Sequence, residues 1–282
     1  MMKTQKAKKQ LATVVVNTGL LVISLAFIMP FYWMFTSSIK SLPDIQKMPP
    51  EAIPLSPTLD NYKQLLGETL YGRSLLNSIF VATITTFLVL FLCSLAGYAF
   101  AKLHFCGRDQ LFILMMAAML VPTIVLLIPT YIIMTKVGLI DTFWSLILIN
   151  IAPPFGIFWM RQYIMSAVHD ELIEAALIDG ASYFGGYWRV VLPIITPALA
   201  SLAIFTFTLS WNSFLQPLTL LRSPENLTYP VQLVAMQSIT FPVRPTHLIM
   251  AGATLSVIPI LIIFIFLQRY FVSGLTAGAV KG

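Results

Sequence analysis

The residues of this chain that could do chemistry are few, and four carboxylates gather in one short segment. Only 10% of the 282 residues are charged, yet Asp170, Glu171, Glu174 and Asp179 fall within ten residues. A carboxylate such as Glu174 can form a charge-assisted contact with a basic residue of a partner molecule. Recognition of another protein is therefore one kind of chemistry open to this segment.

Other kinds of chemistry are missing from the sequence. It contains neither the glycine-rich lysine motif of nucleotide-binding loops nor the H-E-x-x-H and G-x-S-x-G patterns of hydrolases. His104, His169 and His247 fall in separate loops or helix ends, without the spacing of metal ligands. Cys93 lies in an apolar segment and Cys106 in a turn, so no disulfide is indicated. The sequence predicts a chain that is not an enzyme and binds no metal or cofactor of its own.

The elements that must position these residues are almost entirely apolar. Apolar residues make up 58% of the chain, and its mean hydropathy is +0.85. Runs of about 18 or more apolar residues are typical of membrane-spanning helices. The sequence therefore predicts an all-α integral membrane protein with six transmembrane helices, at about 11–35, 75–101, 111–134, 143–163, 199–220 and 248–270.

The middle of every predicted span lacks Asp, Glu, Lys, Arg and His. Proton- and ion-coupled carriers usually need ionisable side chains within the bilayer, so a self-sufficient secondary carrier is disfavoured. A membrane enzyme or receptor is disfavoured by the lack of a catalytic set or soluble domain. A transporter with neither an ion relay nor a nucleotide site must take its energy from a partner.

Prolines and amides do occur near the middle of the spans. Pro122, Pro129, Pro153, Pro154 and Pro259 each remove a backbone donor, and the freed carbonyl needs protein or water around it. The amides, which are costly when they face lipid, are Asn150, Asn212 and Gln216. Two interpretations stay open: an irregular, wet path between helices, or ordinary interhelical hydrogen bonds.

The distribution of Lys and Arg predicts the orientation of the chain. Four lysines precede the first span, which places the N-terminus in the cytoplasm and, after six spans, the C-terminus as well. A signal peptide is the alternative for this segment, but the apolar run is too long and no cleavage site follows it. The expected cytoplasmic segments are thus 1–10 and 271–282, around a permease domain at 11–270. The net charge of +6 suits anionic lipid headgroups, and no nucleic-acid signature is present.

The carboxylate segment, about 165–197, is predicted to be helical and cytoplasmic. Asp170 and Glu171 suit the positive end of a helix, and Gly180 suits the residue just past its end. Ser182 can cap a second short turn that stops near Pro193. On these residues alone, a simple amphipathic connector on the membrane surface is as good an interpretation as a docking element.

The residues Glu174-Ala-Ala, Gly180 and Val190-x-Leu192-Pro193 resemble the signature of bacterial ABC-importer permeases, named EAA after its first residues. That signature ends I-x-L-P, so Val190 is a departure from it. In that family the element is a coupling helix that docks into a cleft of the ATPase subunit. The resemblance implies this role for the residues Glu174, Ala175, Ala176, Asp179, Gly180, Leu192 and Pro193.

Further blocks resemble the carbohydrate-uptake branch of these permeases, and more narrowly the smaller maltose-type subunit. They include Gly138-Leu-Ile-Asp-Thr142, Trp211-Asn-Ser-Phe214 and the tail from Gly274 to Gly282. The resemblance implies a bacterial cell (inner) membrane and four kinds of partner component: a second permease, two ATPase copies that carry ATP and Mg, an extracytoplasmic sugar-binding protein and membrane lipid. The proline-rich connection at 39–73 is either a docking surface for the binding protein or a packed extramembrane cap.

The implied substrate is a sugar or oligosaccharide, which proteins bind through aromatic faces and amide groups. The residues expected along its path are Asn150, Trp211, Asn212 and Gln216. Trp211 and Asn212 can equally be structural. A permease for another solute, such as glycerol phosphate or a polyamine, is the alternative, although an anionic ligand would favour basic residues that the spans lack.

Overall fold

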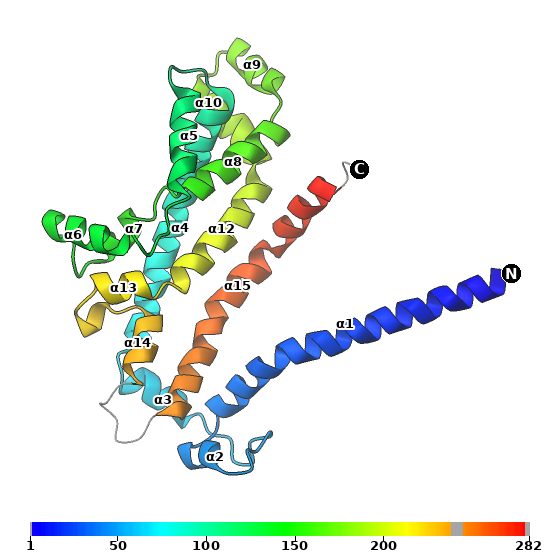
Figure 1. Ribbon diagram of the computed structural model, residues 1–282, viewed down its shortest axis with the longest axis vertical. Coiled ribbons are helices and arrows are strands. Elements are labelled where there is room, and N and C mark those ends of the chain that lie inside the picture. Colours follow the sequence, from blue (N-terminus) through cyan, green and yellow to red (C-terminus); the bar gives the residue numbers. More distant parts are fainter. Residues whose placement is uncertain (1, 238–244, 280–282) are drawn as a thin grey trace. The chain divides into compact units, whose positions relative to one another are not determined.

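The computed structural model describes residues 2–237 and 245–279, and side chains over residues 13–237 and 245–268. Over these ranges the chain is helical and contains no strand (Figure 1). The all-α prediction is confirmed for this part of the chain. The helices are α1 (Met2–Ser38), α2 (Leu42–Gln46), α3 (Asp60–Gly67), α4 (Tyr71–Lys102), α5 (Arg108–Ala118), α6 (Leu127–Val137), α7 (Phe143–Leu148), α8 (Pro154–Ala167), α9 (Asp170–Ile178), α10 (Tyr183–Gly186), the π-helix η1 (Tyr187–Val191), α11 (Leu192–Ile194), α12 (Thr196–Trp211), α13 (Leu215–Leu220), the 3₁₀-helix η2 (Pro224–Asn226), α14 (Tyr229–Ala235) and α15 (Thr246–Ala279).

The chain divides into two compact units. The first comprises residues 1–69 and 235–256, and the second comprises residues 70–234 and 257–282. Of the expected terminal segments, residues 1 and 280–282 lie outside the described residues, as does the stretch 238–244.

The first unit contains residues 39–69 of the proline-rich connection at 39–73, where buried hydrogen bonds are formed. The Asn61 amide donates to the carbonyl oxygens of Ser38 and Lys40, both at 2.8 Å. The Lys40 ammonium donates to the Glu51 carbonyl and lies 5.1 Å from the centre of the Trp33 ring. These bonds fix the start of the connection against Asn61 and Glu51, whereas most residues from 47 to 60 are exposed.

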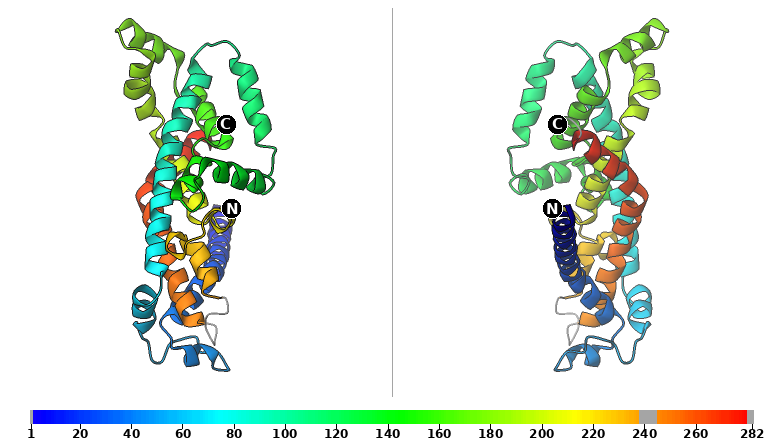
Figure 2. Two further views of the ribbon diagram at one scale, coloured as in Figure 1. Left: turned by 90° about the vertical axis from the view of Figure 1, so that its left-hand side faces the viewer. Right: turned by 90° about the vertical axis from the view of Figure 1, so that its right-hand side faces the viewer.

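The core of the second unit forms where α4 packs against α8 and α12 (Figure 2). The α4–α8 crossing is close because glycine occupies it: a Cβ atom at Gly97 would lie 2.7 Å from Met160 Cβ and 2.9 Å from the Arg161 nitrogen. Such contacts allow two backbones to approach without intervening side chains. Val89, Cys93 and Ile164 fill the space around this crossing and are fully buried.

Three described helices are long and apolar enough to cross a membrane without a break: Thr13–Ser38, Tyr71–Lys102 and Thr246–Gln268. These match three of the six predicted spans. A fourth crossing is possible where Tyr183–Ile194 and Thr196–Trp211 meet at a bend of 78°. Six unbroken spans are therefore not present in the described part of the chain.

Two of the remaining predicted spans are broken near a proline, and the third, 199–220, is broken between Trp211 and Leu215. Within 111–134, α5 ends at Ala118 and α6 begins at Leu127, on either side of Pro122. Within 143–163, α7 ends at Leu148 and α8 begins at Pro154. Proline removes a backbone donor and disfavours helical geometry in the residue before it, so helices end ahead of it. In contrast, α15 continues through Pro259.

Candidate functional site

The carboxylate segment forms α9, whose two ends are defined by its sequence. Asp170 and Glu171 occupy the first turn, where the helix dipole favours negative charge. At the other end, the Gly180 nitrogen donates to the Leu177 carbonyl at 3.0 Å and the Ala181 nitrogen to the Ala176 carbonyl at 2.9 Å. This pair of bonds is a Schellman motif, and it needs the left-handed conformation that Gly180 adopts at φ +82°. The predicted helix and its glycine stop are confirmed.

One face of α9 is buried and the other is exposed. Ile173 inserts into the core of the second unit and is 6% exposed. Glu174, Ala175 and Asp179 are exposed, and Ala176 is half-buried. Ile178, beside them, is 85% exposed. The helix thus presents carboxylates, a small alanine and a bare apolar side chain on one surface.

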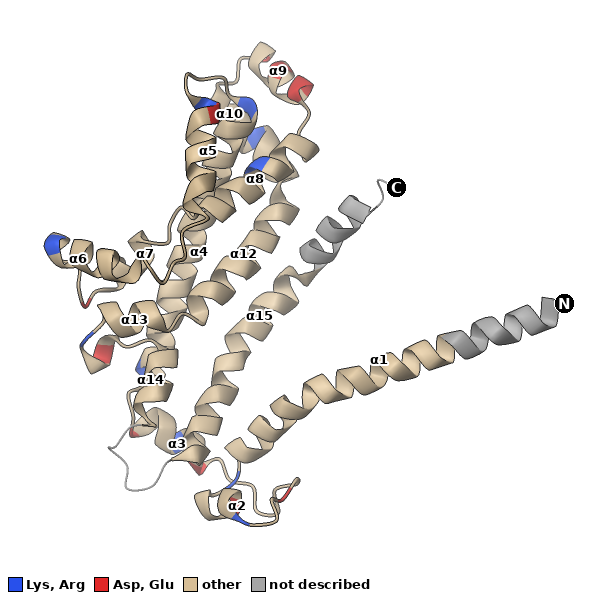
Figure 3. Cartoon of the chain, in the orientation of Figure 1, with Lys and Arg blue, Asp and Glu red and all other residues tan. Residues whose placement is uncertain are grey.

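An ion pair connects the start of α9 to the end of α4. The Lys102 ammonium lies 2.5 Å from the Asp170 carboxylate, and their side chains are 7% and 77% exposed. The Lys102 ammonium holds the pKa of Asp170 below its usual range. Each charge also suits its own helix end, cation at the C-terminus and anion at the N-terminus. Figure 3 shows further basic residues near this end, on α5, α8 and α10–η1.

After α9 the chain turns through three short helical pieces into α12. The Ser182 hydroxyl accepts from the Gly185 nitrogen at 3.1 Å, so the predicted cap is confirmed. Tyr187 begins the π-helical turn; it is buried, and its hydroxyl shares a hydrogen bond of 2.7 Å with Ser94 of α4. Leu192 is half-buried against the core, while Pro193 is exposed in the first turn of α11.

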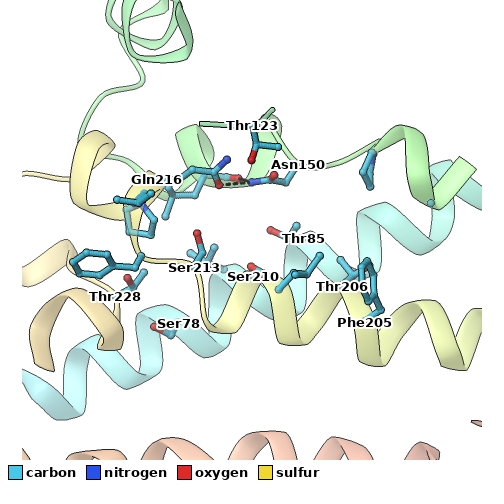
Figure 4. Close-up of a pocket in the computed structure, with 18 of the residues that line it drawn as sticks. Ser78, Thr85, Thr123, Asn150, Phe205, Thr206, Ser210, Ser213, Gln216 and Thr228 are labelled. Carbon is cyan, nitrogen blue, oxygen red and sulfur yellow. Dashed lines mark hydrogen bonds between the residues drawn. The ribbon is translucent and has the colours of Figure 1, made fainter. Parts of the chain in front are cut away.

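A cavity of about 540 Å³ lies in the second unit, bounded by α4, α7, α8, α12, α13 and the break before α6 (Figure 4). The helix breaks contribute to its wall: Thr123 comes from the break before α6 and Asn150 from the break before α8. The other polar residues that line it are Ser78, Thr85, Thr206, Ser210, Ser213, Gln216 and Thr228. No ionisable side chain occurs among the described residues that line this cavity.

Two of the expected path residues meet at this cavity. The Asn150 amide donates to the Gln216 side-chain oxygen at 3.0 Å and to the Leu146 carbonyl at 2.9 Å. Trp211 and Asn212 do not line it. Trp211 is buried between Phe207 and Tyr229, whose ring centres lie 5.7 and 4.6 Å away. Asn212 accepts from the Tyr229 hydroxyl at 2.9 Å.

Asp141 organises the loops that join α6 to α7 and α13 to α14, whereas the sequence showed it only as a span-end residue within the block Gly138–Thr142. It has a left-handed backbone at φ +63°, which is uncommon outside glycine. Its carboxylate accepts from the Arg222 nitrogen at 2.9 Å, from the nitrogen and hydroxyl of Ser223, and from the Asn226 amide. Burial opposes ionisation, but these donors outweigh it and lower the pKa of Asp141 to about 2. The signal available in the sequence was a lone acid, within the block Gly138–Thr142, between two predicted apolar spans.

The hydroxyl residues of the cavity were also missed. Serine and threonine are common in membrane helices because they bond back to their own helix, so they carry little signal singly. Ser78 and Thr85 are two turns apart on α4, and that spacing was the available clue. No group of three or more His, Cys, Asp or Glu residues that could hold a metal occurs among the described residues.

Comparison with known proteins identifies the family. Residues 93–277 match the binding-protein-dependent transport system inner membrane components. The chain belongs to this family. It is a multi-pass membrane protein of the inner-membrane component type.

Similar members of the family cover most of the chain. The arabinooligosaccharide permease AraQ of Halalkalibacterium halodurans is 37% identical over 81% of each chain, and that of Bacillus subtilis 34% over 93% of each. The maltodextrin permease MdxG of Bacillus subtilis is 37% identical over 80% of this chain and 81% of its own. A bacterial ABC transporter for import of the acidic polysaccharide alginate contains a chain of the same fold. Its TM-score is 0.82 and its identity 25%, over 91% of this chain and 95% of that chain.

Proposed function

We propose that this family member is one of two permease subunits of an ATP-driven importer that takes up a sugar or oligosaccharide. Its similarity to arabinooligosaccharide and maltodextrin permeases over most of its length supports this. The chain forms half of the translocation path. A second permease forms the other half, and an extracytoplasmic binding protein delivers the substrate. Membrane lipid surrounds the spans.

The observation that carries the proposal is the exposed face of α9. Glu174, Ala175 and Asp179 lie on the accessible side of a helix whose opposite side is held by Ile173. A small, partly apolar surface with carboxylates suits a groove that carries a basic residue. In the importer, α9 is the coupling helix and docks into the ATPase subunit. Leu192 and Pro193 pass its motion to α12.

The energy source then lies outside this chain. Two copies of an ATPase subunit bind ATP and Mg, and this subunit has no catalytic role. ATP binding closes the ATPase pair, displaces α9 and moves the helix bundle from inward-open to outward-open. Hydrolysis resets it.

The proposal includes six crossings of the inner membrane, with both termini in the cytoplasm. Three crossings are the unbroken helices, and two are the broken pairs α5–α6 and α7–α8. The remaining crossing is α12 with α13, and the 78° bend before Thr196 separates it from Tyr183–Ile194. The basic residues Lys102, Arg108 and Arg189, in or beside the segments near α9, support a cytoplasmic position for that end.

The substrate assignment is supported by the neutral wall of the cavity. Asn150 and Gln216 line the path, and Trp211 and Asn212 fix its wall from behind. Glycerol phosphate or a polyamine would bring a charge, which is costly to bury without a partner. No ionisable side chain lines the cavity in the described part of the chain.

The first experiment is a gentle pull-down of the full chain from native membranes, compared with Glu174→Ala. The wild type should recover an ATPase subunit, and Glu174→Ala should recover severalfold less. Glu171→Ala is the matched control, because Glu171 is also an exposed carboxylate on α9 but lies in its first turn. Recovery of no ATPase with any variant would contradict the coupling role.

ATP-driven uptake tests the transport role separately. Vesicles that contain the wild-type chain should take up radiolabelled arabinotriose, maltotriose or trehalose only when ATP is supplied on the cytoplasmic side. Uptake by the isolated chain without ATP would favour a secondary carrier instead.

A further inference from the structure

We propose that the 540 Å³ cavity is itself a binding site for a neutral, polyhydroxylated ligand, so that this subunit holds a sugar directly. The proposal rests on the importer function above and adds to it a site within one subunit. Four observations carry it: buried hydroxyls without partners, unused amide groups, a wall without charge, and adjacent aromatic rings.

Two threonine hydroxyls in the wall lack a hydrogen bond. Thr85 and Thr228 are 2% and 5% exposed, and neither hydroxyl has a partner within the described residues. A buried hydroxyl without a partner is costly, so such groups are usually satisfied by something bound beside them. Both residues line the cavity, where a ligand can reach them.

The amide pair supplies further capacity. Asn150 uses its amino group on Gln216 and Leu146. Within the described residues this leaves the Asn150 carbonyl oxygen and the Gln216 amino group free to bond a ligand. One is an acceptor and the other a donor. Figure 4 shows the pair on one side of the cavity, with Thr85, Ser210 and Ser213 on the opposite side.

These groups select the class of ligand. Hydroxyls and amides both donate and accept, which matches the hydroxyl groups of a sugar. A charged ligand would lose its hydration without gaining a counter-charge. The rings of Phe155 and Phe205, with centres 5.0 Å apart, offer apolar faces on which the C–H face of a sugar ring can pack. The volume lies in the range of small-molecule sites, about 300–1,000 Å³.

The test is protection of a cysteine placed in the wall. In native membrane vesicles, the full chain carries Ser213→Cys in a Cys106→Ser background, and labelling by a small maleimide is timed. Maltotriose and arabinotriose are the probes, and a trimer of galacturonic acid is the anionic control. We expect at least one neutral probe to slow labelling severalfold, and the anionic trimer to leave it unchanged. In the native chain, labelling of exposed Cys106 should not respond to sugar.

The threonines provide a matched pair of variants. Removing both unpartnered hydroxyls with Thr85→Val and Thr228→Val should raise the sugar concentration for half-protection about tenfold or more. Thr86→Val is the control, because Thr86 is also buried with an unpartnered hydroxyl but does not line the cavity. Valine keeps the shape of threonine, and labelling in denaturant normalises each variant for expression.

The outcomes separate this proposal from the importer function. The site is overturned if no neutral sugar slows the labelling of Cys at position 213. It is also overturned if added detergent or lipid, without sugar, slows labelling as much as sugar does. Equal effects of the Thr85/Thr228 and Thr86 variants overturn it as well. If the complex takes up sugar with ATP but sugar does not protect the introduced cysteine from labelling, the importer function is supported and this binding site is contradicted. Protection without ATP-driven uptake supports the site and contradicts the importer function.

Discussion

The Lys102 ammonium lies 2.5 Å from the Asp170 carboxylate, so the last residue of α4 is joined to the first residue of α9. Besides the covalent connections at its two ends, α9 is held to the rest of the unit by this ion pair and by the packing of Ile173 in the core. If α9 docks on a partner as proposed, its displacement would pull on α4, which lines the cavity.

Asp170→Asn should reduce sugar uptake per ATP hydrolysed by a factor of a few, while ATPase activity persists. The change leaves the largely buried Lys102 without its counter-charge, so α9 is held less firmly. Parallel uptake and phosphate-release measurements in proteoliposomes of the assembled importer give the ratio.

The double variant Lys102→Asp with Asp170→Lys should recover part of this loss. Recovery should be incomplete because both swapped charges oppose their helix dipoles. Asp109→Asn is the control, since Asp109 pairs with its neighbour Arg108. If Asp109→Asn uncouples as strongly as Asp170→Asn, the effect is not specific to α9.

Gly180→Ala should weaken the end of α9 and lower the recovery of the ATPase subunit. Space is available for the methyl group, but φ at +82° penalises any side chain by about 1 kcal/mol. Co-purification measures the effect. Gly67→Ala, which also meets open space but lacks a positive φ, should leave recovery unchanged.

Gly97→Ala should destabilise the helix bundle by about 1–3 kcal/mol, because the added methyl overlaps the backbone of Arg161 and the Cβ of Met160. A lower midpoint in a thermal unfolding scan of the purified complex would report it. Gly185→Ala, whose added Cβ meets only ordinary contacts from 3.5 Å, should behave like the wild type. Equal midpoints for the two variants would rule out the close crossing.

Asp141→Asn should lower the unfolding midpoint at neutral pH by several degrees, because the amide replaces an anion that accepts four hydrogen bonds. The folded-state pKa is about 2, below the ordinary 3.8. The carboxylate therefore stabilises the fold fully above about pH 5, and this contribution is lost as pH falls toward 2.

The difference in unfolding midpoint between the wild type and Asp141→Asn should accordingly become smaller as the pH falls from about 4 to 2. Unfolding scans from pH 2 to 7 measure it. Ser223→Ala removes the hydroxyl donor but keeps the backbone donors, so it should lower the unfolding midpoint less than Asp141→Asn does. A difference that grows on acidification would contradict the assigned pKa.

The helix α9 could be predicted because its signals are local. Two acids at the start, apolar residues at helical spacing and Gly180 at the end all fall within one short window. The three unbroken spans could be predicted from equally local signals, because the hydropathy and length of each apolar run are enough to identify it.

The helix breaks could be predicted only in part. Pro122 and Pro153 stand at breaks, whereas Pro129 lies in the first turn of α6 and Pro259 lies within continuous α15. Proline is tolerated in a first turn because the amide there has no intrahelical partner. In the interior, neighbouring groups decide whether the helix continues, and the sequence does not specify those neighbours.

The cavity could not be predicted because it is made by tertiary packing. Thr85, Asn150 and Gln216 are far apart in the sequence and meet because α7 packs against both α4 and α13. The amides were noticeable because they are costly in lipid, but the threonines were not.

The π-helical turn at Tyr187–Val191 contains one residue more per hydrogen-bonded loop than an α-helix does. Removing one residue there would convert it to regular helix and rotate everything before it by about 100° relative to α12. Tyr187 would lose Ser94, and the acidic face of α9 would point elsewhere. The widened turn therefore sets the angle at which the exposed face of α9 stands relative to α12.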